Sequence, residues 1–241
     1  ILILALHFGT LLALLVYYRK KLLRYVKVSW KKFILRKNLK HKEERDIRVV
    51  RNVFISIIPA LIVGLLLENL ISGFYDNETN LQVVGPVILV PLILFGIVFI
   101  FEERIFKNSN KKMEGLNSST ALKLGLVQPL AFVRGVSRSG ITILGGRFLG
   151  LKRIEAAEYS FLISIPLLSV TSIYGLYKLL KLPPEQIGNE AGLAIVGLIT
   201  AFISGLLAVH FLLKYLKNNS LRIFGIYRVV FGVTLLFIIL N

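Results

Sequence analysis

The segment "AFVRGVSRSGITILGG" (131–146) decides the fold, because it interrupts an apolar region, 121–150, with arginines and glycines. The chain is 55% hydrophobic and its mean hydropathy is +0.73. An apolar run of about 20 residues is long enough to cross a bilayer. Six further apolar runs cover about 1–18, 53–74, 83–101, 159–180, 191–213 and 223–240. These features predict an all-α, polytopic membrane protein that forms a single integral-membrane domain over 1–241.

The charges between the apolar runs orient them. Loop 19–52 holds 14 Lys/Arg against 3 acids, and basic loops face the cytoplasm. The alternative of a nucleic-acid site is disfavoured because membrane spans flank this loop, so we expect no nucleic-acid partner. Loop 75–82 has two acids and no Lys/Arg and is expected outside, whereas loop 214–222 is basic and is expected inside.

This orientation forces region 121–150 to leave the cytoplasmic side and return to it. It is therefore either a re-entrant hairpin or a pair of short crossing helices. Non-helical backbone at membrane depth is tolerated only when it is buried in protein or lines a wet cavity, and glycines supply the flexibility that such a turn needs. Intramembrane arginine marks a functional site by default. The alternative is that Arg134 and Arg138 reach the interface from a helix end.

A short internal similarity indicates an inverted repeat. "IPALIVGLLL" (58–67) and "ITAFISGLLA" (199–208) share six identities in ten, and they fall in spans of opposite direction, as the middle spans of inverted repeats do. Repeat one would cover about 1–101 and repeat two about 121–240, each with three spans and a re-entrant hairpin. The first hairpin is missing from repeat one and would precede residue 1.

The residues of the turn suit an anion. Arginine presents a planar fork that matches two phosphate oxygens, hydroxyls add hydrogen bonds, and a glycine turn before a helix directs N–H groups at an anion. These interactions predict a site for a lipid phosphate or diphosphate. Its candidate residues are Arg138, Ser137, Ser139, Thr142, Gly135 and Gly140.

Other polar residues are assigned ordinary structural positions. A hydrolase needs a general base or a metal, and no candidate base lies beside the turn. Glu155 and Glu158 are expected on a solvated helical turn. Arg228, near the start of the last span, is expected to extend its side chain to the inner surface. We therefore expect no metal ligand within this chain.

The stretch "LVQPLAFVRGVSRSGITILGGRFLGLKRIEAAEYSFLISIPLL" (126–168) resembles the second signature region of the undecaprenyl-diphosphate phosphatase family, also called bacitracin-resistance proteins. "ALHFGTLLALLVYYRKK" (5–21) and "FGIYRVVFG" (224–232) resemble other stretches of that family. The matching signature residues are Gln128, Gly135, Ser137, Arg138, Ser139, Gly140, Thr142, Ser160, Phe161, Leu162 and Pro166.

This resemblance implies a plasma-membrane hydrolase that converts undecaprenyl diphosphate to the monophosphate and so recycles the lipid carrier of cell-wall synthesis. It also implies a divalent cation, Mg or Ca. Arg138, Ser137 and Ser139 would be catalytic, with Gly135, Gly140 and Thr142 around the diphosphate. Arg134 stands where the family usually has proline, and it either contacts the diphosphate or reaches the interface.

One family feature has no counterpart within 1–241: the first signature, a Glu-rich turn followed by a Ser-Ser-x-Gly-His stretch. We therefore expect these residues alone to lack phosphatase activity. Two other functions stay open from sequence. A transporter could move polyprenyl phosphate between leaflets, because inverted repeats with midplane sites are typical of transporters. A channel or structural membrane protein would leave Arg138 at the interface. The oligomeric state is not indicated.

The repeat makes a prediction about the gene. The reading frame upstream of Ile1 is expected to encode a second re-entrant hairpin that enters from outside. Sequencing the region checks this. Paired glutamates with a Ser/His turn there would favour hydrolysis, and a hairpin without them would favour transport. A long soluble domain, or no coding sequence, would contradict the repeat.

Overall fold

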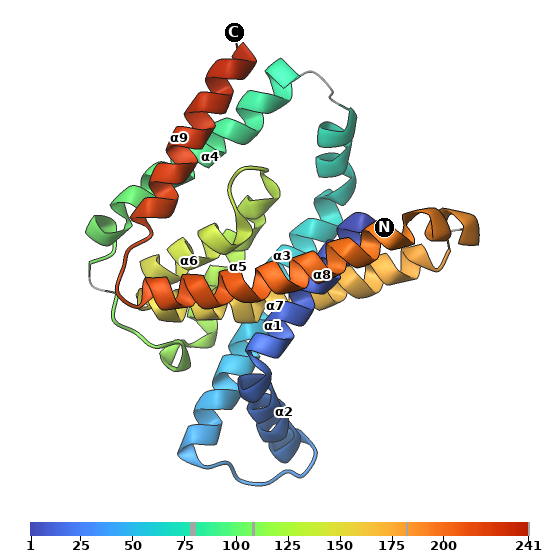
Figure 1. Cartoon of the computed structure of the whole chain (residues 1–241). Coiled ribbons are helices and arrows are strands. Elements are labelled where there is room, and N and C mark those ends of the chain that lie inside the picture. The colour runs from blue at the N-terminus through green and yellow to red at the C-terminus, as the bar shows by residue number, and fades with distance from the viewer. Residues whose placement is uncertain (78–80, 108, 182, 241) are drawn as a thin grey trace. The chain divides into compact units, whose positions relative to one another are not determined.

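A computed structural model describes residues 1–77, 81–107, 109–181 and 183–240. Within these ranges the chain is helical and contains no β-strand, which confirms the all-α fold. The helices are α1 (Leu2–Tyr17), α2 (Arg19–Phe33), α3 (His41–Asn77), α4 (Leu81–Ile105), α5 (Ser118–Val127), α6 (Arg138–Phe148), α7 (Arg153–Leu179), α8 (Pro184–Leu216) and α9 (Arg222–Leu240), with short 3-10 turns η1 (Met113–Gly115) and η2 (Gln128–Phe132) (Figure 1).

Five of the described helices are long and apolar enough to cross a membrane. Their candidate spans are His41–Leu67, Gln82–Ile105, Arg153–Tyr177, Glu190–Leu216 and Arg222–Leu240. The expected first span corresponds to α1, which is followed at once by α2 with a bend of 77° between them. The multi-pass membrane architecture expected from the sequence is confirmed.

Residues 19–52 do not form the loop that the charge count suggested. They form α2, a turn over 34–40 and the beginning of α3. The reason is that apolar residues recur at helical spacing among the lysines, so a helix can separate an apolar face from a charged one. The cytoplasmic side of this segment stays a prediction. The expected outer loop at 75–82 falls partly on 78–80, outside the described residues.

The chain divides into two compact units. The first comprises Ile1–Val50 and Phe161–Tyr215, and the second comprises Arg51–Ser160 and Leu216–Asn241. Each unit combines segments that are distant in sequence. The proposed repeats, about 1–101 and 121–240, follow a different division and stay a prediction.

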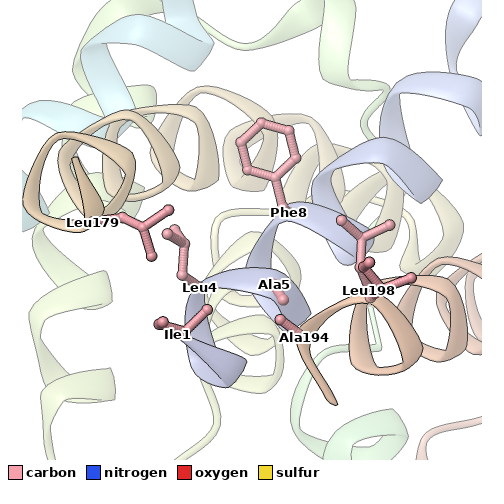
Figure 2. A pocket seen from close by; sticks show the side chains of 8 residues that line it. Ile1, Leu4, Ala5, Phe8, Leu179, Ala194 and Leu198 are labelled. Carbon is pink, nitrogen blue, oxygen red and sulfur yellow. The ribbon is translucent and has the colours of Figure 1, made fainter. Parts of the chain in front are cut away.

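In the first unit, small residues allow α1 and α8 to approach closely. A Cβ at Gly9 would collide with the backbone of Leu198 in α8, and one at Gly205 would lie 3.0 Å from the Ala13 side chain. Small residues at such crossings are typical of membrane helices. A nearby pocket has a volume of about 200 Å³, and its lining side chains are all apolar (Figure 2). None of its lining side chains offers a polar group to a phosphate. The labelled residues are Ile1, Leu4, Ala5, Phe8, Leu179, Ala194 and Leu198.

In the second unit, α4 and α9 lie side by side (Figure 1). Gly96 and Gly225 face each other at their crossing, where a Cβ at Gly225 would come within 2.5 Å of the Gly96 carbonyl oxygen and 2.8 Å of the Ile100 nitrogen. The two backbones are therefore nearly in contact, and α4 and α9 form a close-packed pair.

A buried ion cluster joins the end of α4 to the end of α6. Glu102 is fully buried and forms ion pairs with Arg147 and with Arg153, the latter at 3.2 Å. Arg147 also donates to the carbonyl oxygen of Phe106 at 2.9 Å and to that of Leu151 at 3.1 Å. A buried carboxylate is tolerated only with such partners, so the cluster holds these segments in one arrangement.

Glu102→Ala should destabilise the protein by about 3–5 kcal/mol, because it leaves two arginines without their buried counter-charge. Glu103 provides a matched control. Its side chain is 59% exposed and also pairs with Arg153, so Glu103→Ala should cost less than about 1 kcal/mol. The apparent melting temperature in detergent measures both changes. Equal losses would contradict the assigned role of Glu102.

Candidate diphosphate-binding site

Residues 118–148 form two short helices in the region 121–150 for which the sequence predicted either a re-entrant hairpin or a pair of short crossing helices. α5 and α6 contain 10 and 11 residues, or about 15–17 Å each at 1.5 Å per residue. Neither helix can cross a hydrocarbon core of about 30 Å. They pack against each other, and a Cβ at Gly145 would lie only 2.9 Å from the Leu124 side chain. The chain therefore forms a hairpin of two short helices, with η2 and a turn between them, and its entry into the membrane from one side stays a prediction.

The turn before α6 has an unusual backbone. Gly135 has a φ of 95° and Ser137 a φ of 75°, in the left-handed region that a side chain makes unfavourable. A Cβ at Gly135 would also overlap the carbonyl of Ile88 in α4. Glycine is thus required at 135, while the strain at Ser137 is a local cost of the kind that clusters at functional sites.

The turn ends at the N-terminus of α6. Ser137 caps this helix, since its Oγ accepts a hydrogen bond from the N–H of Gly140 at 3.3 Å. The N–H groups of Arg138 and Ser139 lie in the first turn, where helix geometry provides no intrahelical acceptor. The helix dipole adds partial positive charge at the same end. An anion placed there would meet both N–H groups and this charge.

Arg138 adds a full positive charge to the helix end. Its side chain is partly buried, and no other residue in the described part of the chain forms a hydrogen bond or ion pair with its guanidinium group. Ser137 and Ser139 flank Arg138 in the sequence, and their Oγ atoms lie 3.5 Å apart. The structure therefore gathers a cation, two hydroxyls and a helix N-terminus in one turn of chain.

The other expected site residues have different surroundings. Thr142 is buried and its hydroxyl donates to the Arg138 carbonyl oxygen at 2.8 Å, so it could donate to a phosphate only after that bond breaks. Gly140 is buried, and a Cβ there would lie 2.7 Å from the Phe99 ring. Arg134 is exposed at the start of the turn. Its two alternatives, contact with the diphosphate or extension to the interface, both stay open.

Arg228 is a site residue whose role the sequence did not indicate. The expectation that it extends to the inner surface is wrong, because its guanidinium group donates to the carbonyl oxygens of Gly135 (2.5 Å), Val136 (3.2 Å) and Leu92 (3.3 Å). Its Cζ also lies 5.4 Å from the centre of the Phe99 ring. Arg228 thereby satisfies the carbonyls of the turn. The sequence did contain a signal for this role. Arg228 lies inside an apolar span, and the carbonyls of the glycine-containing turn need hydrogen-bond donors.

The first arm of the hairpin is held against α3. Gln128 is buried and donates from Nε2 to the carbonyl oxygen of Ser56 at 2.6 Å. The Ser56 hydroxyl donates in turn to the carbonyl oxygen of Ala121 at 2.8 Å. The phenolic oxygen of Tyr159 lies 3.0 Å from the same hydroxyl. These bonds fix the position of α5 and η2, and with them the position at which the turn begins.

The position of Glu155 also differs from expectation. Instead of lying on a solvated turn, its Oε2 accepts a hydrogen bond from the backbone N–H of Met113 at 3.0 Å, and the residue is partly buried. It stabilises the segment between α4 and α5. Its role is structural, and it supplies no base to the turn at Gly135–Ser139.

Comparison with known proteins identifies the relatives of this chain. Residues 1–234 match the family described as "Bacitracin resistance protein BacA". The chain belongs to this family. It is 35% identical to "Undecaprenyl-diphosphatase 1" of Clostridioides difficile over 230 residues, which is 95% of this chain and 77% of that protein. It is 37% identical to the "Undecaprenyl-diphosphatase" of Aquifex aeolicus over 190 residues, covering 78% and 71% respectively.

The expected divalent cation of the BacA family does not fit the side chains at this turn. They are arginines and hydroxyl groups, whereas Mg and Ca prefer carboxylate and carbonyl oxygens. Among the described residues, no group of three or more His, Cys, Asp or Glu is placed to hold a metal ion. The cation therefore stays a prediction from the resemblance, and no step below depends on it.

Gly135→Ala should disrupt the turn of this BacA protein. The substitution adds a side chain at a φ of 95° and places it against the Ile88 carbonyl, so a loss of clearly more than about 1 kcal/mol is expected. Gly115→Ala is the control, because a Cβ there meets nothing within 4 Å. Thermal stability in detergent measures both. A Gly135→Ala protein as stable as Gly115→Ala would contradict the close approach of the turn to α4.

Proposed function

We propose that this BacA protein hydrolyses undecaprenyl diphosphate to undecaprenyl phosphate and inorganic phosphate. The observation that carries the proposal is the partly buried Arg138 guanidinium at the N-terminus of α6, which no described residue engages. A cation, hydroxyls and N–H groups at one helix end suit a diphosphate. The names of the relatives, which are undecaprenyl-diphosphatases, supply the substrate class and the reaction.

The residues of the turn would bind and polarise the terminal phosphate. Arg138 can donate two parallel hydrogen bonds to its oxygens, while the first N–H groups of α6 and the hydroxyls of Ser137 and Ser139 contact the remaining ones. Water attacks the terminal phosphorus, the anhydride P–O bond breaks, and undecaprenyl phosphate leaves with the bridging oxygen. Positive charge fixed near the breaking bond stabilises the transition state. The general base is not among the residues of this turn.

The cellular setting follows from the same proposal. Hydrolysis of this carrier regenerates the lipid used for peptidoglycan synthesis, and bacitracin resistance, as in the family description, follows from such recycling. The protein would lie in the bacterial plasma membrane, with the basic segment 19–52 on the cytoplasmic side. The transport alternative gains no support from the relatives, which are named for a phosphatase activity.

Arg138→Ala tests the site. Phosphate release from undecaprenyl diphosphate in detergent micelles should fall about 100-fold or more, as when one transition-state donor is removed from other enzymes. The protein assayed is the full reading frame that contains this chain. Arg104→Ala is the matched control, since Arg104 is an exposed arginine at the end of α4, and it should retain full activity.

Two other outcomes would contradict the proposal. Activity of Arg138→Ala equal to that of the control would remove Arg138 from the working site. No release from the unsubstituted protein, together with binding of the lipid diphosphate that Arg138→Ala abolishes, would overturn hydrolysis and favour transport.

A further inference from the structure

Helix α2 carries an apolar stripe that the described residues leave exposed. Its sequence, RKKLLRYVKVSWKKF, contains no acid. Tyr25 and Val28 are buried on one side of the helix, 7% and 4% exposed. The opposite side presents four large apolar side chains at helical spacing, each between 58% and 69% exposed. This exposed stripe consists of Leu23, Val26, Trp30 and Phe33.

The stripe has a fixed orientation, because α2 is anchored to the beginning of α3. Arg24 forms an ion pair with Asp46 at 3.0 Å, and Lys31 forms one with Glu43 at 2.7 Å. Asp46 is itself buried, at 4% exposure. The turn over 34–40 reverses the chain between the two helices (Figure 1). A helix held on one face in this way presents the other face consistently.

A basic pocket adjoins the stripe. It has a volume of about 480 Å³ and lies between α2, the turn and the first residues of α3. Its lining includes five basic residues, Arg24, Lys27, Lys31, Lys37 and Lys42, and two acids, Glu43 and Asp46. The two acids pair with Arg24 and Lys31. Lys27, Lys37 and Lys42 form no ion pair with any carboxylate in the described ranges, so the pocket keeps a positive charge.

We infer that the pocket and the stripe together bind an anionic phospholipid. The unpaired lysines suit the headgroup phosphate, while Trp30, which lines the pocket and also belongs to the stripe, directs the acyl chains along the apolar face. Helices with one apolar and one basic face lie in the membrane interface and favour anionic lipids. This inference concerns the first unit alone and is independent of the reaction proposed for Arg138.

A phospholipid would contact both the lysines and the apolar stripe, whereas a soluble phosphate would contact only the lysines. A free phosphate would use the lysines but would leave the four stripe residues in water. The position of α2 in the chain also favours a bilayer: α1 ends at Tyr17, and α3 continues into the span that includes residues up to Leu67. Tryptophan at the membrane–water boundary is a frequent anchor.

Trp30 is also the probe for the test, because it is the only tryptophan in these 241 residues. The full-length protein is placed in nanodiscs that contain zwitterionic and anionic lipid, one of which is brominated either near the headgroup or near the chain end. Bromine quenches tryptophan at contact. A Trp30→Phe sample provides the background to subtract.

The inference predicts stronger quenching by the bromines near the headgroup than by those near the chain end. It also predicts about twofold or more stronger quenching by brominated anionic lipid than by brominated zwitterionic lipid. The triple variant Lys27→Gln, Lys37→Gln, Lys42→Gln should remove that preference and leave the depth profile unchanged. The control variant Lys107→Gln, Lys112→Gln, in the segment after α4, should keep it.

Three results would overturn the inference. No quenching by either brominated lipid would show that water or another protein surface covers the stripe. Equal quenching by anionic and zwitterionic lipid would remove the anionic headgroup. Loss of the lipid preference on addition of millimolar inorganic phosphate, at constant ionic strength, would assign the pocket to a soluble phosphate instead.

Discussion

The backbone carbonyls of the hairpin turn need hydrogen-bond donors, because the turn packs against the apolar helices α4 and α9. The packing of the second unit depends on how this need is met. Away from water, an unsatisfied carbonyl is costly. Arg228 supplies the donors for Gly135 and Val136 from α9. The close approach of the turn to α4 in turn demands glycine at 135. Contacts within the protein therefore define the conformation of the turn, and a preorganised turn is what a precise anion site needs.

Three arginines of this unit have different roles because their neighbouring groups differ. Arg147 meets a buried carboxylate and stabilises the structure. Arg228 meets backbone carbonyls and shapes the turn. Arg138 meets neither among the described residues, so its guanidinium stays available for a ligand. All three lie in otherwise apolar sequence, where a charged side chain indicates function by default. Only the contacts distinguish a ligand-binding arginine from a structural one.

The basic segment after α1 shows a similar division of charge. Two of its cations pair with the acids of α3 and fix the direction of α2, while others remain unpaired around a pocket. The net charge of residues 19–52 predicts which side of the membrane they face. It does not indicate which of their cations are paired and which remain unpaired. The helical spacing of Leu23, Val26, Trp30 and Phe33 carries the additional information, because it places apolar and basic side chains on separate faces.

The sequence alone determined the all-α membrane fold, the positions of most spans and the hairpin at 121–150, because length, hydropathy and local charge act through each residue's own transfer to lipid. It also identified the turn around Arg138, since the chemistry of phosphate recognition resides in consecutive residues. Only the tertiary structure decided the partners of Arg228, Glu102 and Gln128. Those contacts join residues 45 to 136 positions apart, and a pattern that depends on local spacing cannot specify which distant donor will meet which carbonyl.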